Sequence, residues 1–162
     1  MVLYTLSLLN AIVLNMTTLT INKKAKFDYE FLEKYEAGLV LFGHEVKSIK
    51  TGHISLKGAF VTVHNNELYL TNALIPLYQH AGNIKDYDPN RSRKLLVKKS
   101  EIRSLIGKKT QTGLTMIPIR VYTRRNLIKL EFALAKGKTK YDKRNAIKKR
   151  ETNRKIHMAL KQ

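Results

Sequence analysis

The chain has 162 residues, 31 of them Lys or Arg and 12 Asp or Glu, which gives a formal net charge of +19. This length suits one compact domain with residues left over for tails. The charge indicates an acidic partner, most commonly nucleic acid, because each contacted phosphate releases a counterion. Because cysteine is absent, disulfides, Cys-ligated zinc and thiol nucleophiles are excluded.

The first 21 residues carry no charged side chain, and residues 6–14 resemble the apolar core of a signal peptide. No basic region precedes that core, and no small-x-small cleavage site precedes Met16. The segment is also short for a membrane span, which needs about 20 mostly apolar residues. We favour a third interpretation, in which translation starts at Met16. Residues 1–21 are therefore left outside the predicted domain.

Strand-like patterning runs through the middle of the chain. Apolar or alternating segments cover residues 27–31, 38–42, 60–70, 117–122 and 127–134. Residues 64–67 (HNNE) and 123–126 (TRRN) predict hairpin turns, since Asn accepts positive φ. Alternation after residue 116 places Ile117, Ile119 and Val121 on an apolar face, with Arg120 and Tyr122 opposite.

Two short helices are predicted among these strands. Residues 45–50 form one, ended by Gly52, and residues 100–106 form the other, with Ser100 as N-cap and Gly107 as the stop. The fold class is therefore mainly β with short helices (α+β). An OB-type closed β-barrel over residues 22–135 is the best match, because such barrels present strands and loops to nucleic acid, and a small sandwich is the alternative.

Composition changes after the barrel, and residues 136–162 form a basic tail. From residue 135 onward the chain has eleven basic and two acidic residues, and its apolar face is thin. A helix with little to bury is a poor helix in water. We therefore expect the tail to be disordered when free and helical on an RNA surface, with a solvated basic helix as the alternative.

The sequence shows no constellation for catalysis or metal binding. The five histidines lack metal-ligand spacing, and Gly137-Lys138-Thr139 fails as a phosphate-binding loop because Phe132 stands where its first glycine belongs. The chain is therefore expected not to be an enzyme and to need no cofactor. Basic clusters carry the signal instead, above all residues 88–96, where Arg side chains can fork onto phosphates.

Several ordered blocks resemble the small protein B family, the SsrA-binding proteins. They are NKKAKFDYE (22–30), EAGLVLFGHEVKSIKTG (36–52), DPNRSRKLL (88–96), KSEI (99–102) and ALAKGKTKYDKR (133–144). The resemblance covers the chain from about residue 22 to its end. Phe27 stands where a His is common in the family, and His44 and Lys50 also replace usual residues.

The resemblance implies an OB-type barrel that binds the tRNA-like domain of tmRNA (SsrA RNA) in the cytoplasm. It implies delivery to stalled 70S ribosomes for trans-translation, with the tail in the decoding centre and the empty mRNA channel. Elongation factor Tu would join indirectly, through aminoacylated tmRNA. No membrane partner is expected, and the chain is expected to be a monomer.

Positions that match the family motifs give the implied site residues. The residues linked to tmRNA are Asn22, Lys23, Glu36, Glu45, Lys47, Arg93, Lys94, Leu96 and Tyr141. The residues linked to the ribosome are Asp142, Lys143, Arg144, Lys148, Arg150 and Arg154. Glu36 and Glu45 could accept hydrogen bonds from RNA or orient nearby cations, and Glu45 could instead pair within its helix. Asp142 could also be the N-cap of the tail helix.

Two other functions compete with this one. A ribosomal or general single-strand RNA-binding protein could use the same barrel, without preference for a tRNA-like fold. A protein of anionic membranes could use the leader and the basic tail, provided that the leader stays on the mature chain.

Overall fold

The computed structural model describes residues 16–82, 84–109, 113–139, 142, 144, 151–154, 156 and 158–160. Its strands are β1 (Met16–Ile21), β2 (Tyr29–Leu39), β3 (Phe60–His64), β4 (Glu67–Thr71), β5 (Arg93–Leu96), β6 (Leu114–Arg124) and β7 (Leu127–Gly137). Its helices are α2 (Lys23–Asp28), α3 (Gly43–Lys50) and α4 (Lys99–Lys109). The fold is thus mainly β with short helices, as predicted.

Six strands pair antiparallel in a closed cycle. The order β6-β3-β4-β5-β2-β7 returns to its start through the pairing of β7 with β6, and β1 lies beside β6 outside the cycle. Such closure leaves no unpaired edge between the first and last strands. This ring of strands is the arrangement that the barrel prediction requires.

Residues 16–21 belong to the sheet, although the sequence boundary at residue 22 left them out. They form β1, which pairs with β6 from Met16 opposite Arg124 to Ile21 opposite Arg120. The absence of charge grouped this segment with the apolar leader. Its threonines are nevertheless β-branched residues that suit an edge strand. Residues 1–15, which hold the rest of the leader, lie outside the described residues.

A bulge in β6 overturns the predicted faces of that strand. Its pairing with β7 shifts between Pro118 and Arg120, so Ile119 is an extra residue that faces no partner. Beyond the bulge, Val121 faces the main core, whereas Ile117 packs in a separate cluster outside it. Strict alternation had placed these two residues together, because period-two counting cannot detect an inserted residue.

The two predicted hairpins are confirmed. Asn65 and Asn66 have φ of 48° and 58° between β3 and β4, and Arg125 and Asn126 have φ of 49° and 65° between β6 and β7. Positive φ at both central residues is the geometry that two-residue turns need to match strand twist.

Other element boundaries moved. Residues 27 and 28 end α2 instead of starting a strand, and residues 40–42 lie beyond β2. The helix predicted over 45–50 is confirmed as α3, while α4 begins before Ser100 and continues through Gly107. Gly107 costs an exposed helix only about 1 kcal/mol, which is too little to end it.

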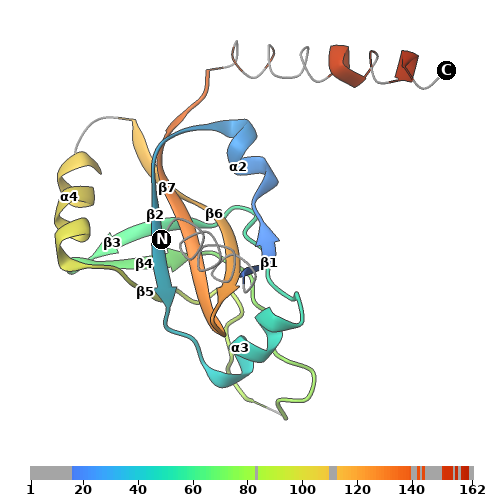
Figure 1. Cartoon of the computed structure of the whole chain (residues 1–162). Helices are drawn as coiled ribbons and strands as arrows, with labels where there is room; N and C mark the ends of the chain where they lie inside the picture. The colour runs from blue at the N-terminus through green and yellow to red at the C-terminus, as the bar shows by residue number, and fades with distance from the viewer. Residues whose placement is uncertain are drawn as a thin grey trace, which may run out of the picture.

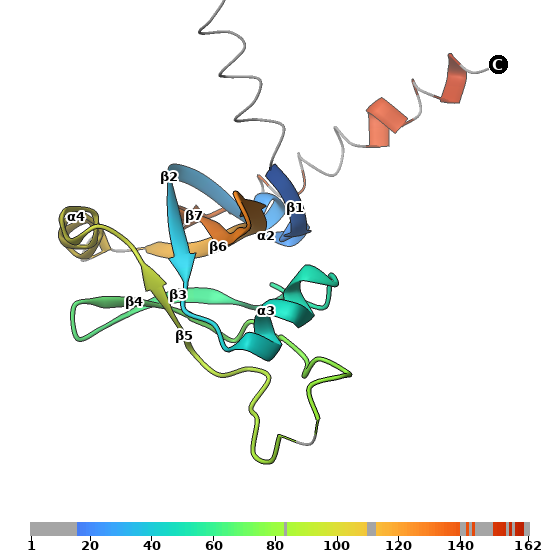
Figure 2. The same ribbon diagram turned by 60° about the horizontal axis from the view of Figure 1, so that its bottom comes forward.

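Helices cover three parts of the ring (Figures 1 and 2). Ile49 of α3 and Leu105 of α4 are fully buried in the main core, which also holds Leu68, Leu130 and Phe132 from the strands. Helix α2 covers the outer side of the sheet through Ala25. In both views, α3 and α4 lie on different sides of the ring. The α3 side also carries the long connection between β4 and β5.

From Asp142 onward the described residues of the tail are exposed and, apart from Leu160, helical, whereas Lys136 and Gly137 still belong to β7. Residues 151–154 form a helical turn, and the Leu160 amide donates to the carbonyl oxygen of Ile156 at 3.1 Å. The described residues from 151 onward lie away from the ring (Figure 1). Ile156, Met158 and Leu160 are 53%, 59% and 79% exposed, so the described part of this helix buries little. No helix among the described residues is long and apolar enough to cross a membrane.

Candidate nucleic-acid interface

A buried ion pair links α3 to the start of β5. Glu45 and Arg93 are both 0% exposed, and Glu45 Oε1 accepts from Arg93 Nε at 3.0 Å and Nη2 at 2.9 Å. The same guanidinium also donates to the carbonyl oxygens of Ala73 and Pro89. A buried charge needs such partners, because an unpaired one costs several kcal/mol.

Three further groups complete the shell around Glu45. Oε2 accepts from the Phe42 amide at 2.8 Å and from Arg91 Nη2, and Oε1 accepts from Arg91 Nε at 2.9 Å and the Tyr87 hydroxyl at 3.2 Å. Burial by itself would raise the pKa of Glu45, but hydrogen bonds from Arg91, Phe42 and Arg93 outweigh it and lower that pKa. Glu45 is therefore a carboxylate that orients cations.

This geometry changes how the 88–96 segment is interpreted. The arginines of DPNRSRKLL were expected to fork onto phosphates, but Arg93 places its fork on Glu45 instead. The alternative for Glu45, a salt bridge within its own helix, is also wrong, because its charged partners are Arg91 and Arg93. Arg91 and Arg93 thus share Glu45 as their partner.

Glu36 lies in a second, more open cluster across β2, β6 and β7. Its Oε1 accepts from Lys129 Nζ at 2.7 Å, its Oε2 accepts from the Tyr122 hydroxyl, and Arg124 Nη1 lies 3.7 Å from Oε2. The Lys129 and Tyr122 hydrogen bonds lower the pKa of Glu36, and burial raises the pKa of Tyr122. The Glu36 side chain remains 37% exposed, so it can still meet a ligand.

Asn22 is committed to the fold on both sides of its amide. Its Oδ1 accepts from the Ala25 amide at 3.1 Å and caps α2, while its Nδ2 donates to the carbonyl oxygens of Leu56 at 3.2 Å and Pro118 at 3.1 Å. One side chain thus ties α2 to the loop before β3 and to β6. Lys23, the next residue, is exposed.

The remaining barrel positions face solvent to different degrees. Lys47 is exposed on α3, with Nζ 5.8 Å from the centre of the Tyr78 ring. Lys94 pairs with Glu67 at 2.5 Å on the sheet surface, and that hydrogen bond raises the pKa of Lys94. Leu96 is 57% exposed beside Gly38. These three residues come from two different elements, Lys47 from α3 and Lys94 and Leu96 from β5.

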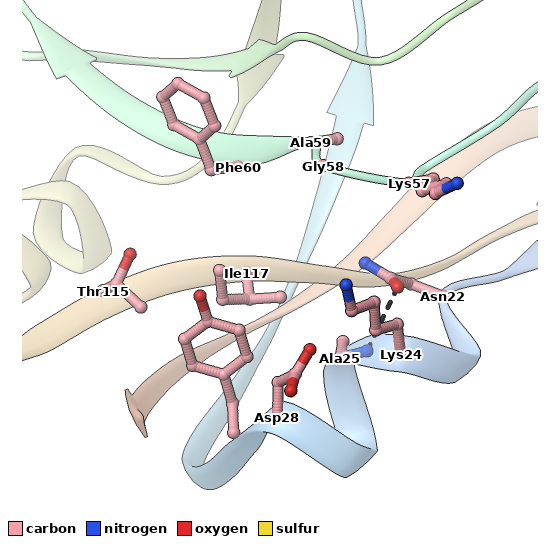
Figure 3. Close-up of a pocket in the computed structure, with 11 residues that line it drawn as sticks. Asn22, Lys24, Ala25, Asp28, Lys57, Gly58, Ala59, Phe60, Thr115 and Ile117 are labelled. Carbon is pink, nitrogen blue, oxygen red and sulfur yellow. Dashed lines mark hydrogen bonds between the residues drawn. The ribbon is translucent and has the colours of Figure 1, made fainter. Parts of the chain in front are cut away.

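An open pocket lies between α2, the start of β3 and β6. Its volume is about 420 Å³. Figure 3 shows Asn22, Lys24 and Lys57 near one another at one side, with Phe60 and Thr115 further along. The charges of this lining are mixed, because Asp28 lies in the pocket together with the two lysines. Among the described residues, no group of three or more His, Cys, Asp or Glu could hold a metal ion.

The start of the tail has a reciprocal cap. Asp142 Oδ2 accepts from the Thr139 amide at 3.2 Å and hydroxyl at 2.6 Å, and the Asp142 amide donates to Thr139 Oγ1 at 3.3 Å. These hydrogen bonds lower the pKa of Asp142. The pattern is a capping box in which Thr139 is the N-cap and Asp142 lies three residues later. The prediction of Asp142 as the N-cap itself was therefore wrong by three residues.

The other tail positions divide in two groups. Arg144 and Arg154 are helical and exposed. The predictions for Tyr141, Lys143, Lys148 and Arg150 fall on positions outside the described residues. The site residues implied by the family motifs did not include Tyr87 and Lys129, which donate hydrogen bonds to the two glutamates. Spacing gave no signal for them, since they lie 42 and 93 residues from their partners.

Comparison with known proteins identifies the family. The family model of the SmpB protein matches residues 19–162. The chain belongs to the SmpB protein family. The match begins inside β1 at residue 19, so it includes the second half of the strand that the sequence boundary excluded.

Individual SmpB relatives match over most of their length. The SsrA-binding protein of Thermosipho africanus is 50% identical over 147 residues, which cover 90% of this chain and 98% of the relative. That of Trichodesmium erythraeum is 48% identical over 141 residues, which cover 87% and 90%. A solved structure described as "tmRNA-SmpB: a journey to the center of the bacterial ribosome" contains a chain with 42% identity and a TM-score of 0.62. That alignment covers 79% of this chain and 93% of the other.

Proposed function

We propose that this chain binds the tRNA-like domain of tmRNA and delivers it to stalled ribosomes for trans-translation in the cytoplasm. The observation that carries the proposal is near-complete coverage at 48–50% identity by relatives named SsrA-binding protein. A net charge of +19 suits a large RNA partner. The role is one of binding and not of catalysis.

The residues linked to tmRNA fall into two groups, buried residues that support the fold and exposed residues that can contact RNA. Glu45 and Arg93 have no exposed surface, so they act as a scaffold for the 87–93 segment and leave direct RNA contact to others. Lys23 and Lys47 are exposed and available to phosphates, Lys94 would contact RNA from its pair with Glu67, and Leu96 offers apolar contact. Glu36 lies beside Lys129 and Arg124, where it can accept a hydrogen bond from RNA or set those cations in place.

The tail is the proposed ribosome contact. Its exposed helical residues offer cations that the ring does not use, and the Thr139–Asp142 cap fixes where the helix starts. Asp142, Lys143, Arg144, Lys148, Arg150 and Arg154 carry this role, with Tyr141 at the junction. Elongation factor Tu would act through aminoacylated tmRNA, and the protein would act as a monomer.

A competition titration tests the proposal. The full chain is titrated with the tRNA-like domain of tmRNA, with an ordinary tRNA and an unstructured RNA as competitors, at two salt concentrations. Preference for the tmRNA domain that persists at the higher salt supports the proposal. Equal binding to all three RNAs, lost as salt rises, would instead favour a general RNA-binding protein.

A further inference from the structure

An exposed aromatic ring stands at the start of α3, beside the buried Glu45 cluster. Phe42 is 53% exposed, and Arg91 Cζ lies 4.1 Å from the centre of its ring. The His44 ring is stacked with Phe42 at a centroid distance of 5.6 Å. A large apolar ring kept at the surface under a guanidinium is the arrangement used to stack a further flat ring.

The buried Glu45 carboxylate holds the Arg91 guanidinium in this position. Arg91 Nε and Nη2 donate to the two carboxylate oxygens of Glu45, which is itself fixed by Arg93. The Arg91 side chain is 25% exposed, whereas Glu45 is 0% exposed. The guanidinium therefore keeps its orientation without a ligand, so stacking on it costs less rotamer entropy than on a free arginine.

The surface beside this pair is open and cationic. Gly43 follows Phe42, and a Cβ added there would meet no atom within 4 Å. Lys47 lies one helical turn beyond Gly43 and is exposed. A base stacked on the Phe42–Arg91 pair would thus find no side chain at Gly43 and an exposed cation further along α3.

We propose that Phe42 and Arg91 form a stacking platform for an unpaired base of the tRNA-like domain of tmRNA. This inference rests on the proposed function and adds to it a contact that the motif positions do not include. Single-stranded bases are the parts of structured RNA that can leave their own stack and lie on aromatic or guanidinium planes. The guanidinium next to the ring, together with the net charge of +19, favours RNA over a protein partner.

The chain has no tryptophan, so Phe42→Trp introduces a single tryptophan at the platform, which can be excited at wavelengths that its 8 tyrosines do not absorb. Ser104→Trp is the matched control, because Ser104 is exposed on α4, on a different side of the ring. We expect Phe42→Trp to bind the tmRNA domain within about twofold of the unmodified chain and to lose fluorescence on binding. Ser104→Trp should bind equally well with little change in fluorescence.

Two further variants separate stacking from apolar contact. Phe42→Ala should weaken binding of the tmRNA domain about tenfold, within the range for loss of one base–aromatic stack. Phe42→Leu keeps apolar bulk without a ring and should lose nearly as much. Circular dichroism should show unchanged folding, since the bond that joins Phe42 to Glu45 comes from its backbone amide.

The outcomes distinguish this inference from the function on which it rests. If the unmodified chain prefers the tmRNA domain but Phe42→Ala binds as tightly and Phe42→Trp is not quenched, the platform is wrong and the proposed function stands. If the unmodified chain shows no preference for the tmRNA domain, the proposed function fails first.

Discussion

Arg93 donates from Nε and Nη2 to one oxygen of Glu45, at 3.0 and 2.9 Å, and neither side chain reaches solvent. This pair fixes the end of the loop that precedes β5 against α3. Breaking a buried pair by removing one partner is costly, because the other charge stays buried without compensation.

Glu45→Ala should therefore lower the free energy of unfolding by about 3–5 kcal/mol, measured by urea denaturation. Glu67→Ala is the matched control, since it removes the Lys94 pair in which both side chains are about 40% exposed. Solvent screens such a pair, so the control should change stability much less. Equal effects of the two variants would mean that the buried cluster does not stabilise the fold.

Acid should reduce the contribution of Glu45 to the free energy of unfolding. Its hydrogen bonds hold its pKa below the ordinary value of about 4.3, so its stabilisation is full above that pH and is lost as pH falls through the lowered pKa. The difference in unfolding free energy between the unmodified chain and Glu45→Gln should be largest above about pH 5 and should shrink below about pH 4. A difference that stays constant from pH 7 to pH 3 would contradict this.

Asn22→Ala should destabilise the protein by about 1–2 kcal/mol, because it removes the cap of α2 and both carbonyl contacts. Asn22→Ser keeps a capping oxygen and should recover part of that loss. Thermal unfolding of the three proteins tests this order. If Asn22→Ala weakens tmRNA binding without any change in stability, the side chain acts on RNA directly.

Glu36→Ala should weaken binding of the tRNA-like domain of tmRNA, because Lys129, Arg124 and Tyr122 all converge on this carboxylate. Tyr122→Phe removes one hydrogen bond to Glu36 and should weaken binding by a smaller factor. Competition titration measures both. Unchanged affinity of Glu36→Ala would remove this residue from the interface.

The double variant Lys143→Ala, Arg144→Ala should leave tmRNA affinity within about threefold, or roughly 0.7 kcal/mol, yet abolish tagging of nascent chains. Both residues follow the Thr139–Asp142 cap in the sequence, and Arg144 is exposed. Lys161→Ala, near the chain end, serves as the single-charge control. A loss of RNA affinity well beyond threefold would show that ring and tail do not act separately.

Much of this protein could be predicted from its sequence. The sequence by itself determined the β-rich class, the two Asn-containing hairpins, helix α3 and the basic tail, because each depends on local backbone preference or composition. The ordered motifs likewise determined the family before any coordinates. The net charge by itself indicated a polyanionic partner but did not identify which RNA it is.

Only the tertiary structure decided how the charges are used. Arg93 and Glu45 lie 48 residues apart in the sequence. No local pattern shows that their charges neutralise each other in the interior of the protein. The Ile119 bulge and the place of β1 in the sheet also depended on partners distant in sequence. Local spacing fixes which way a side chain points along its own element, whereas the packing of distant elements determines what it meets there.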